Sequence, residues 1–206
     1  TFETVASLYD KNFKETGFNS TSVGWPTAES HELRFDKLTS VIDQSESYFS
    51  INDFGCGYGA LLHYLLSYKN FKVSEFNGYD ISKEMLKGAK ENLSDYEVKV
   101  NLFNNKSIST KSDYTFVSGT YNVRCNETNE SWKKYIHKSL KNINDYSKKG
   151  FAFNLLSKYV DWKKDDLFYG DPTYWFDYCK KHFSKHVSLL HDYPLFEWTI
   201  IVKKDL

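Results

Sequence analysis

Several residue types and patterns that mark particular classes of protein are scarce in this sequence. It has only three cysteines, an odd number, among its 206 residues. This argues against a disulfide framework or a cysteine metal cluster and predicts a reducing, cytoplasmic setting. No apolar run approaches the roughly 18 residues that a membrane-spanning helix needs, and the first segment lacks the apolar stretch of a signal peptide. We therefore expect neither a metal site nor a membrane partner.

An excess of one charge is also missing, because Lys plus Arg and Asp plus Glu both total 27. Such a chain has no global field to attract nucleic acid, so we expect no nucleic-acid partner. Aromatic residues, in contrast, are abundant, with 16 Phe, 16 Tyr and 5 Trp. Most of them supply core area, and those outside strands and helices are candidates for a binding site. The length fits one domain, residues 1–206, acting as a monomer or homodimer.

The most informative stretch is the glycine-rich run 53–60, Asp-Phe-Gly-Cys-Gly-Tyr-Gly-Ala. A β-prone run, 48–52, precedes it, and leucines at helical spacing follow it. The glycines therefore lie where a strand turns into a helix, and such a turn lets backbone approach a ligand closely. About twenty residues later a second strand ends at Asp80, where a carboxylate can accept hydrogen bonds from ribose hydroxyls. Together these features predict an adenosine-containing cofactor.

The glycine pattern alone leaves the cofactor open, because Gly55-x-Gly57-x-x-Ala60 also satisfies the dinucleotide fingerprint. A dinucleotide needs the helix N-terminus free for a pyrophosphate, and the carboxylate of Asp53 would repel that group. A sulfonium and an α-ammonium would be attracted by Asp53 instead. This residue favours S-adenosylmethionine over a nicotinamide dinucleotide.

Two motifs carry a family resemblance. The first has the form acid-x-Gly-x-Gly-x-Gly at 53–59, and the second is the acid followed by Ile-Ser-x-x-Met-Leu at 80–86. With both at the expected separation, the chain resembles the class I S-adenosylmethionine-dependent methyltransferases in its order of elements from about residue 48 onward. Stretches 24–25, 32–35, 118–123 and 191–195 look like those of small stand-alone bacterial members whose acceptors are mostly unassigned.

The sequence periodicity agrees with the α/β fold that this resemblance implies. Helical segments are predicted at 4–13, from 26 through 42, at 60–68, at 82–93, around 132–143 and from 171 to 183. Strands are predicted at 48–53, 74–79, 98–103, 114–119, 151–156, 187–191 and 196–202, the last two forming a hairpin around 192–195. We expect a Rossmann-like three-layer α/β/α sandwich with a seven-stranded, mostly parallel sheet and a C-terminal antiparallel hairpin strand. Residues 1–46 would form a helical lid over a core, 47–206.

The resemblance and the edge rule for α/β sheets convert loop positions into cofactor-site candidates. The glycine turn would line the methionine and ribose parts, Asp53 would lie near the amino group, and Asp80 would bind the ribose diol. Ile81 and Met85 would cover the adenine, although Met85 fits core packing equally well. The remaining candidates are Asn104 or Asn105 for the adenine amino group, Ser118 and Gly119 at the methionine end, and Trp25 and Arg34 in the lid. The glycine-turn candidates are Gly55, Cys56, Gly57 and Gly59.

The acceptor side is less well specified. The Asn/Asp-Pro-Pro-Tyr/Phe motif of amino-group methylation is absent after the fourth strand, where Thr-Tyr-Asn stands at 120–122. Tyr121 and Asn122 are therefore the catalytic candidates, against the alternative of a solvated loop. Further substrate-side candidates are Tyr9, Arg124, Asn154, Tyr169 and His191.

We expect a methyltransferase that uses S-adenosylmethionine, releases S-adenosylhomocysteine and methylates an oxygen or nitrogen atom of a small molecule. Two alternatives remain open at the level of sequence. One is an NAD(P)-dependent oxidoreductase that uses the same turn. The other is a catalytically inactive S-adenosylmethionine-binding protein that serves a partner.

Overall fold

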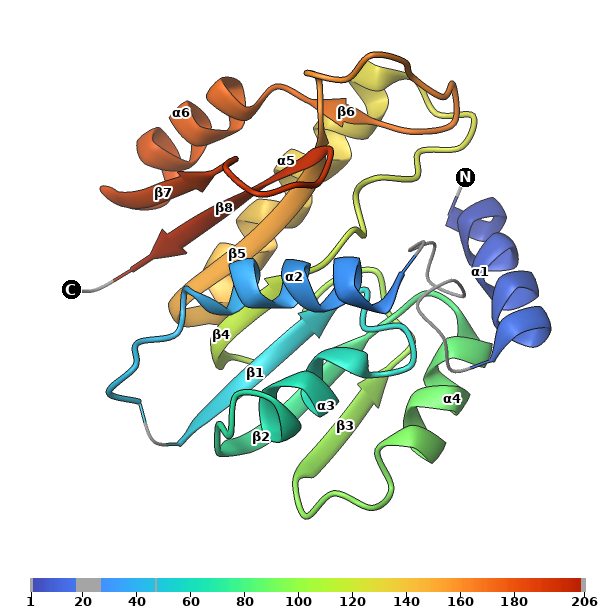
Figure 1. The fold of residues 1–206 in the computed structure, drawn as a ribbon, viewed down its shortest axis with the longest axis vertical. Helices are drawn as coiled ribbons and strands as arrows, with labels where there is room; N and C mark the ends of the chain where they lie inside the picture. The colour runs from blue at the N-terminus through green and yellow to red at the C-terminus, as the bar shows by residue number, and fades with distance from the viewer. Residues whose placement is uncertain (1, 18–26, 47, 205–206) are drawn as a thin grey trace.

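The computed structural model describes residues 2–17, 27–46 and 48–204, in which helices and strands alternate (Figure 1). The helices are α1 (Phe2–Thr16), α2 (Ala28–Thr39), α3 (Ala60–Ser67), α4 (Lys83–Asn92), α5 (Asn129–Tyr146) and α6 (Pro172–His182). The strands are β1 (Phe49–Phe54), β2 (Val73–Tyr79), β3 (Lys99–Phe103), β4 (Ser112–Val117), β5 (Ser147–Ser157), β6 (Tyr169–Gly170), β7 (His186–Leu190) and β8 (Glu197–Lys203).

The strands form one sheet in the order β3-β2-β1-β4-β5-β8-β7. The first five strands of this order are parallel, whereas β8 runs antiparallel to both β5 and β7. This confirms the predicted mostly parallel sheet with its C-terminal antiparallel strand. The two-residue strand β6, which pairs with β5, is an addition that the sequence pattern did not predict. Strand order reverses beside β1, between β2 and β4, and this is where open α/β sheets bind ligands.

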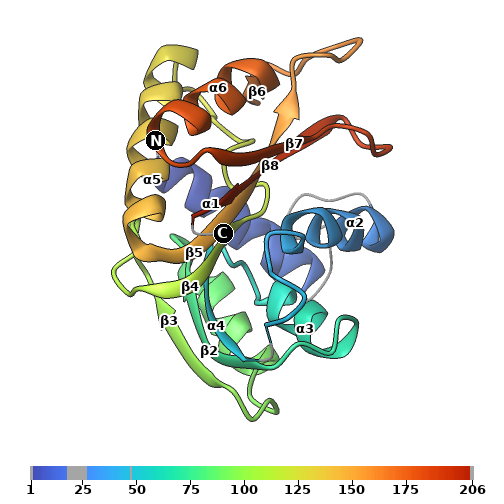
Figure 2. The same ribbon diagram turned by 90° about the vertical axis from the view of Figure 1, so that its left-hand side faces the viewer.

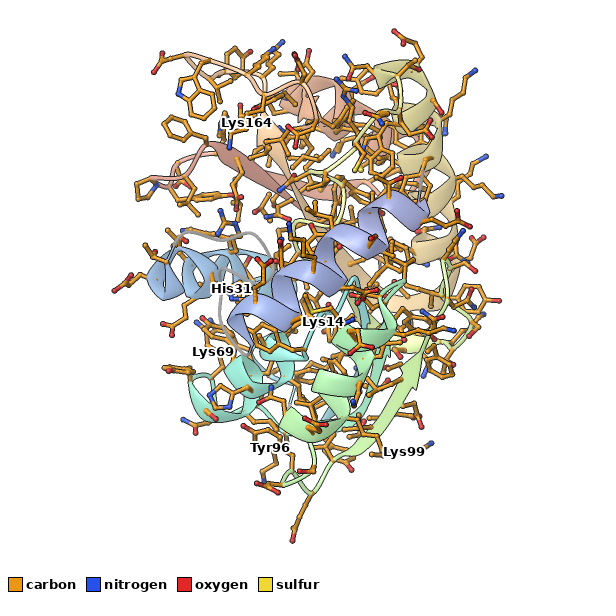
Figure 3. The ribbon with its side chains drawn as sticks, turned by 90° about the vertical axis from the view of Figure 1, so that its right-hand side faces the viewer. Lys14, His31, Lys69, Tyr96, Lys99 and Lys164 are labelled. Atoms are coloured by element: carbon orange, nitrogen blue, oxygen red, sulfur yellow. The ribbon has the colours of Figure 1, made fainter. Side chains whose placement is uncertain are left out.

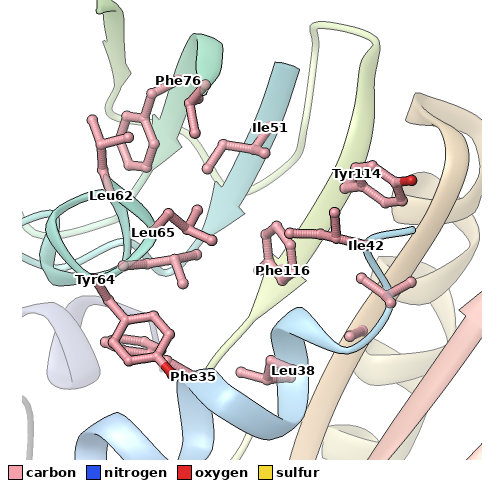
Figure 4. Packing of buried hydrophobic residues seen from close by; sticks show 14 of the residues in the cluster. Phe35, Leu38, Ile42, Ile51, Leu62, Tyr64, Leu65, Phe76, Tyr114 and Phe116 are labelled. Atoms are coloured by element: carbon pink, nitrogen blue, oxygen red, sulfur yellow. The ribbon is translucent and has the colours of Figure 1, made fainter. Parts of the chain in front are cut away.

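Two hydrophobic clusters cover the two faces of the sheet, as expected for a three-layer sandwich. One joins α2 and α3 to β1 and β2, with Phe35, Leu38 and Leu65 packed over Ile51 and Phe116 (Figure 4). The other lies beneath α5 and α6, which stand on the opposite side of the sheet from α2 and α3 (Figure 2). Many of the aromatic residues lie in these clusters, because the largest fully buried side chains are mostly Trp, Tyr and Phe.

Four helices, α2, α4, α5 and α6, begin at an extended residue whose side chain caps the first turn. Thr27 accepts a hydrogen bond from the amide of Ser30 at the start of α2, and Ser82 accepts one from the amide of Met85 at the start of α4. Asp171 caps α6, with Pro172 in the first helical position. Each cap satisfies backbone donors that the first helical turn leaves without partners.

The boundaries of β4 and β5 differ from the prediction. Strand β4 ends at Val117, so residues 118 and 119 belong to the following loop. Strand β5 starts at Ser147, directly after α5 and four residues before the predicted start at 151. Gly150 does not close a turn: a Cβ there would lie 2.6 Å from the carbonyl oxygen of Val202 in the neighbouring strand. Its role is close strand packing.

The two N-terminal helices lie at the carboxyl edge of the parallel strands. Helix α1 packs against α4, and Asp10 on α1 accepts a hydrogen bond from the Ser82 hydroxyl. Helix α2 packs against β5, β8 and α3. Figure 3 shows α1 across the front of this edge, with His31 on α2 beside it. Within the described ranges, no helix combines the length and apolar character needed to cross a bilayer.

Candidate functional site

The glycine turn connects β1 to α3 in a backbone shape that a side chain would disrupt. Gly55 and Gly59 have φ angles of 82° and 83°, in the left-handed region. A Cβ on Gly55 would lie 2.1 Å from the hydroxyl oxygen of Thr120. The turn is also tied to β2, because the amides of Gly55 and Cys56 both donate to the carbonyl oxygen of Tyr79, at 2.7 and 3.1 Å. Glycine is therefore required here by conformation and by space.

The carboxylate of Asp80 connects this turn to the loop after β2. One of its oxygens accepts the amide of Gly57 at 2.9 Å, and the other accepts the amide of Ser82 at 2.8 Å. Ser82 in turn caps α4 and donates to Asp10. The predicted pair of motifs thus meets in space, with Asp80 at the junction of the glycine turn, α4 and α1.

Two carboxyl groups face the same cavity without a compensating positive charge. Burial, and secondly the nearby carboxyl of Asp80, raise the pKa of Asp53 from 3.8 to about 8. Burial is also the largest influence on Asp80 and raises its pKa, although backbone hydrogen bonds act in the opposite direction. Among the described residues that line the cavity there is no Lys or Arg. The electrostatics of the cavity therefore favour a cationic ligand.

The cavity extends from the sheet edge to the helices above it. Its described lining comprises Val5, Tyr9, His31, Phe35, Asp53, Phe54, Gly55, Cys56, Gly57, Tyr58, Ala60, Leu61, Tyr79, Asp80, Ile81, Met85, Asn105, Ser118, Gly119, Thr120, Trp132 and Tyr135. The sheet-edge loops supply the glycines and carboxylates, whereas α1, α2 and α5 supply most of the aromatic rings.

Most of the predicted cofactor residues come together here. Ile81 and Met85 line the cavity, as do Ser118 and Gly119 after β4. The Cys56 thiol is buried, which raises its pKa well above the usual range. Of the two asparagines after β3, Asn105 lines the cavity. Asn104 instead donates to the carbonyl oxygens of Asp80 and Ile81, both at 3.0 Å.

The two predicted catalytic residues do not line the cavity. Gly119, with a φ of 70°, turns the chain so that Tyr121 points into the core, where its hydroxyl hydrogen-bonds Ser139 at 2.7 Å. Tyr121 is fully buried, and burial raises its pKa well above the usual range. Asn122 is also buried and accepts the amide of Leu156 at 3.1 Å. Neither residue lines the cavity, so the cavity geometry does not support the catalytic role predicted for them.

Arg34 and Asn154 are likewise engaged outside the cavity. The guanidinium of Arg34 donates to Glu197 at 2.7 Å, and both side chains are almost fully buried. Asn154 donates to the other oxygen of Glu197 at 3.0 Å and accepts the amide of Gly119 at 2.6 Å. These residues form a buried network that links α2, β8 and β5 to the Gly119 loop. They support the cavity wall and do not line it.

The remaining predicted acceptor residues divide between the cavity and distant loops. Tyr9 lines the cavity, and burial raises its pKa. Arg124 donates to the backbone carbonyls of Leu167, Cys125, Glu127 and Asp165 and so fastens a loop. The Tyr169 hydroxyl accepts the amide of Lys164 at 3.0 Å, and His191 is exposed beside the Tyr159 ring. Trp25 lies outside the described residues.

Two pairs of rings on helices are among the cavity residues to which sequence reasoning assigned no site role. His31 and Phe35 are neighbours on one face of α2, with ring centroids 4.4 Å apart. Trp132 and Tyr135 stand on α5, with centroids 4.9 Å apart. Trp132 was predicted as core from its helical spacing, and His31 only as part of the lid region. No local motif marks these residues, since they converge from helices about one hundred positions apart.

Comparisons with known proteins agree with the site. Residues 52–150 match the family model described as a methyltransferase domain. The protein named "Putative methyltransferase Rv1506c" from Mycobacterium tuberculosis is 43% identical over 158 residues, which cover 76% of this chain and 93% of that protein. This similarity includes the glycine turn, β2 and Asp80 within the matched domain region.

Solved structures share the fold at low sequence identity. Magnesium protoporphyrin IX methyltransferase (ChlM) from Synechocystis PCC 6803, with bound SAH, superposes with a TM-score of 0.68 at 12% identity, over 98% of this chain and 95% of that one. The DhpI-SAH complex gives 0.64 at 12% identity, over 98% and 97%. With the matched domain and the 43% identical relative, the chain belongs to the class I S-adenosylmethionine-dependent methyltransferases.

Proposed function

We propose that this methyltransferase transfers a methyl group to an oxygen or nitrogen atom of a small acceptor held between the sheet edge and helices α1, α2 and α5. The observation that carries the proposal is the pairing of Asp53 and Asp80 in one cavity whose described lining has no basic residue. A cationic methyl donor balances these carboxyls, and the aromatic space beside them remains for an acceptor.

We assign the donor to the sheet-edge loops. Asp80 accepts hydrogen bonds from the ribose hydroxyls, Asp53 attracts the α-ammonium and sulfonium, and the glycine turn brings backbone against the ribose and methionine parts. Ile81 and Met85 flank the adenine, with Asn105 at its edge. This assignment is supported by the position of these residues on the cavity lining, which takes in Gly55, Cys56 and Gly57 of the glycine turn but not Gly59.

The bound donor supplies an electrophilic methyl group on a positively charged sulfur. The task of the protein is to hold the acceptor atom in line with that group and to exclude water. Helices α1 and α2 would act as the lid: Val5, Tyr9, His31 and Phe35 face the cavity from these two helices. The acceptor nucleophile forms a bond to the methyl carbon as the carbon-sulfur bond breaks, and the proton of the nucleophile leaves to solvent or to a nearby base.

The cofactor assignment is tested by calorimetric titration of S-adenosylhomocysteine into the wild type, Asp80→Ala and Asp161→Ala. Asp161 is exposed and lies outside the cavity lining, so its substitution is the matched control. We expect Asp80→Ala to lose about ten- to a hundredfold in affinity, as for a charge-assisted hydrogen bond worth roughly 1.5–3 kcal/mol. Equal affinity in all three proteins would refute the assignment of Asp80.

A further inference from the structure

The part of the cavity that the donor loops leave open is walled by aromatic rings. Tyr9 comes from α1, Phe35 from α2, and Trp132 and Tyr135 from α5. These rings reach the cavity from three helices, whereas the glycines and carboxylates come from the loops at the sheet edge. Flat apolar surfaces of this kind bind aromatic rings by stacking and edge contacts.

The α5 side of this wall is held by contacts to the core. The indole nitrogen of Trp132 donates to the carbonyl oxygen of Tyr121 at 2.8 Å. The ring of Tyr135 lies against Trp132 and meets the buried ring of Tyr121 edge-on, with centroids 6.1 Å apart. Tyr121, held by its hydrogen bond to Ser139, therefore supports the wall from behind. A preformed wall lowers the entropy cost of binding a rigid ligand.

The described lining of the cavity contains no Lys or Arg. Two arginines close in the sequence to cavity residues are engaged elsewhere: Arg34 is paired with Glu197, and Arg124 is bonded to backbone carbonyls. The histidine at the wall, His31, has its pKa lowered to about 4 by burial and by Arg34, so it is neutral at neutral pH. An anionic acceptor would find no described cationic partner in the lining and would face Asp53 and Asp80.

From the aromatic wall and the absence of a basic residue in the described lining, we infer that the acceptor is an uncharged molecule with an aromatic ring that carries the hydroxyl or amine to be methylated. This inference rests on the proposed function, because it takes the sheet-edge half of the cavity as the donor site. It separates phenol-like and aniline-like acceptors from carboxylates and phosphate esters, which the wall and the carboxyls together disfavour.

Three matched probes test the inference on protein saturated with S-adenosylhomocysteine at pH 7.5. They are 2-naphthol, which is neutral and aromatic, 2-naphthoate, which has the same rings with an anionic group, and decahydro-2-naphthol, which is neutral but saturated. Calorimetry or the fluorescence of the cavity tryptophan reports binding. We expect 2-naphthol to bind at least tenfold more tightly than 2-naphthoate and several-fold more tightly than the saturated alcohol.

Two variants locate the binding. Tyr135→Leu should weaken 2-naphthol binding at least fivefold while S-adenosylhomocysteine affinity and the melting temperature change little. Tyr159→Leu, at an exposed ring outside the cavity lining, should leave both ligands unaffected. Because Tyr135 is only partly buried, its substitution tests the wall without emptying the core.

The outcomes distinguish failure of the inferred acceptor class from failure of the proposed function. Equal or tighter binding of 2-naphthoate, or no detectable binding of 2-naphthol by protein that binds S-adenosylhomocysteine normally, overturns the acceptor class and leaves the donor site intact. Failure of the wild type to bind S-adenosylhomocysteine overturns the proposed function, and the acceptor class with it. An unchanged 2-naphthol affinity in Tyr135→Leu overturns the assignment of the aromatic wall.

Discussion

At the scale of single residues, the charge state of Asp53 is the most consequential feature of the cavity. Burial and the neighbouring carboxyl of Asp80 raise its pKa to about 8, so the empty cavity holds Asp53 largely protonated at pH 7. A bound cation favours the ionised form and lowers this pKa. Binding of S-adenosylmethionine should therefore release a proton from Asp53.

The sign of the resulting pH dependence is fixed by this release. Because the free protein carries the proton and the complex does not, affinity should rise with pH up to about 8, by at most about tenfold per pH unit. Titrations of S-adenosylmethionine into the wild type and Asp53→Asn between pH 6 and 8.5 measure this pH dependence. Because the variant lacks the carboxyl of residue 53, subtracting its slope removes the contribution of the ligand's own titration. The variant should bind more weakly and lose the extra slope; equal slopes would contradict the role given to Asp53.

The same group affects the stability of the unliganded protein. A carboxyl whose folded pKa lies above its unfolded pKa favours folding at low pH, and this contribution is lost as pH rises from about 4 to about 8. Asp53→Asn removes the titration. Denaturant unfolding should show that the variant gains stability relative to the wild type between pH 5 and pH 8.5, and a constant difference between the two proteins would count against the buried carboxyl.

Gly55 offers a second test at the residue scale. Alanine there combines a φ of 82° with a clash against Thr120, whose hydroxyl is held by the carbonyl oxygen of Phe54 at 2.8 Å. Gly17→Ala is the matched control, because Gly17 has a φ of 65° and a Cβ there would meet no atom of the described residues within 4 Å. We expect Gly17→Ala to cost about 1–2 kcal/mol of unfolding free energy from strain alone. Gly55→Ala should cost more and abolish S-adenosylhomocysteine binding; equal losses would remove the steric argument.

At the scale of elements, helix α2 is attached to the sheet through a buried ion pair. Arg34 on α2 and Glu197 on β8 have side chains only 6% and 1% exposed, and Asn154 extends the network to the amide of Gly119. This arrangement connects the helix that carries His31 and Phe35 to the loop that carries Gly119. The network thereby fixes the distance between the two halves of the cavity.

Breaking this pair should be costly because it leaves a buried charge without its partner. We expect Arg34→Met or Glu197→Gln each to lose about 3–5 kcal/mol of unfolding free energy, and the double variant to lose less than their sum. The control is the surface pair between Asp36, on the same helix, and Lys69, which follows α3; Asp36→Asn should change stability by less than about 1 kcal/mol. Urea denaturation of the single variants, the double variant and the control measures these losses. Additive losses in the buried pair would show that Arg34 and Glu197 are not energetically coupled.

At the scale of the whole molecule, the sequence predicted what local patterns encode. The glycine turn and Asp80 belong to contiguous motifs, so their meeting at the edge of β1 and β2 followed from strand order alone. The hairpin at the end of the chain was likewise readable from alternating apolar residues around Pro194. In both cases the residues that meet in space are close in the chain or lie on strands joined by a single parallel crossover.

The acceptor side escaped prediction for two physical reasons. The residue pattern places Tyr121 in a loop at the sheet edge but does not give the direction of its side chain, which points into the core and hydrogen-bonds Ser139 after a left-handed turn at Gly119. The rings of Phe35 and Tyr135 approach from helices that pack onto opposite faces of the sheet, and their convergence is a property of the assembled sandwich. The buried partner of Arg34, Glu197, could not be predicted from a local pattern because it lies 163 positions away.

The most direct test of the central claim is a crystal structure of the protein with S-adenosylhomocysteine. The account predicts the ribose hydroxyls within hydrogen-bond distance of the Asp80 carboxylate, the amino group beside Asp53, and the sulfur directed toward the aromatic wall of Phe35, Trp132 and Tyr135. A ligand bound elsewhere, or bound with its ribose away from Asp80 or its sulfur away from that wall, would contradict it.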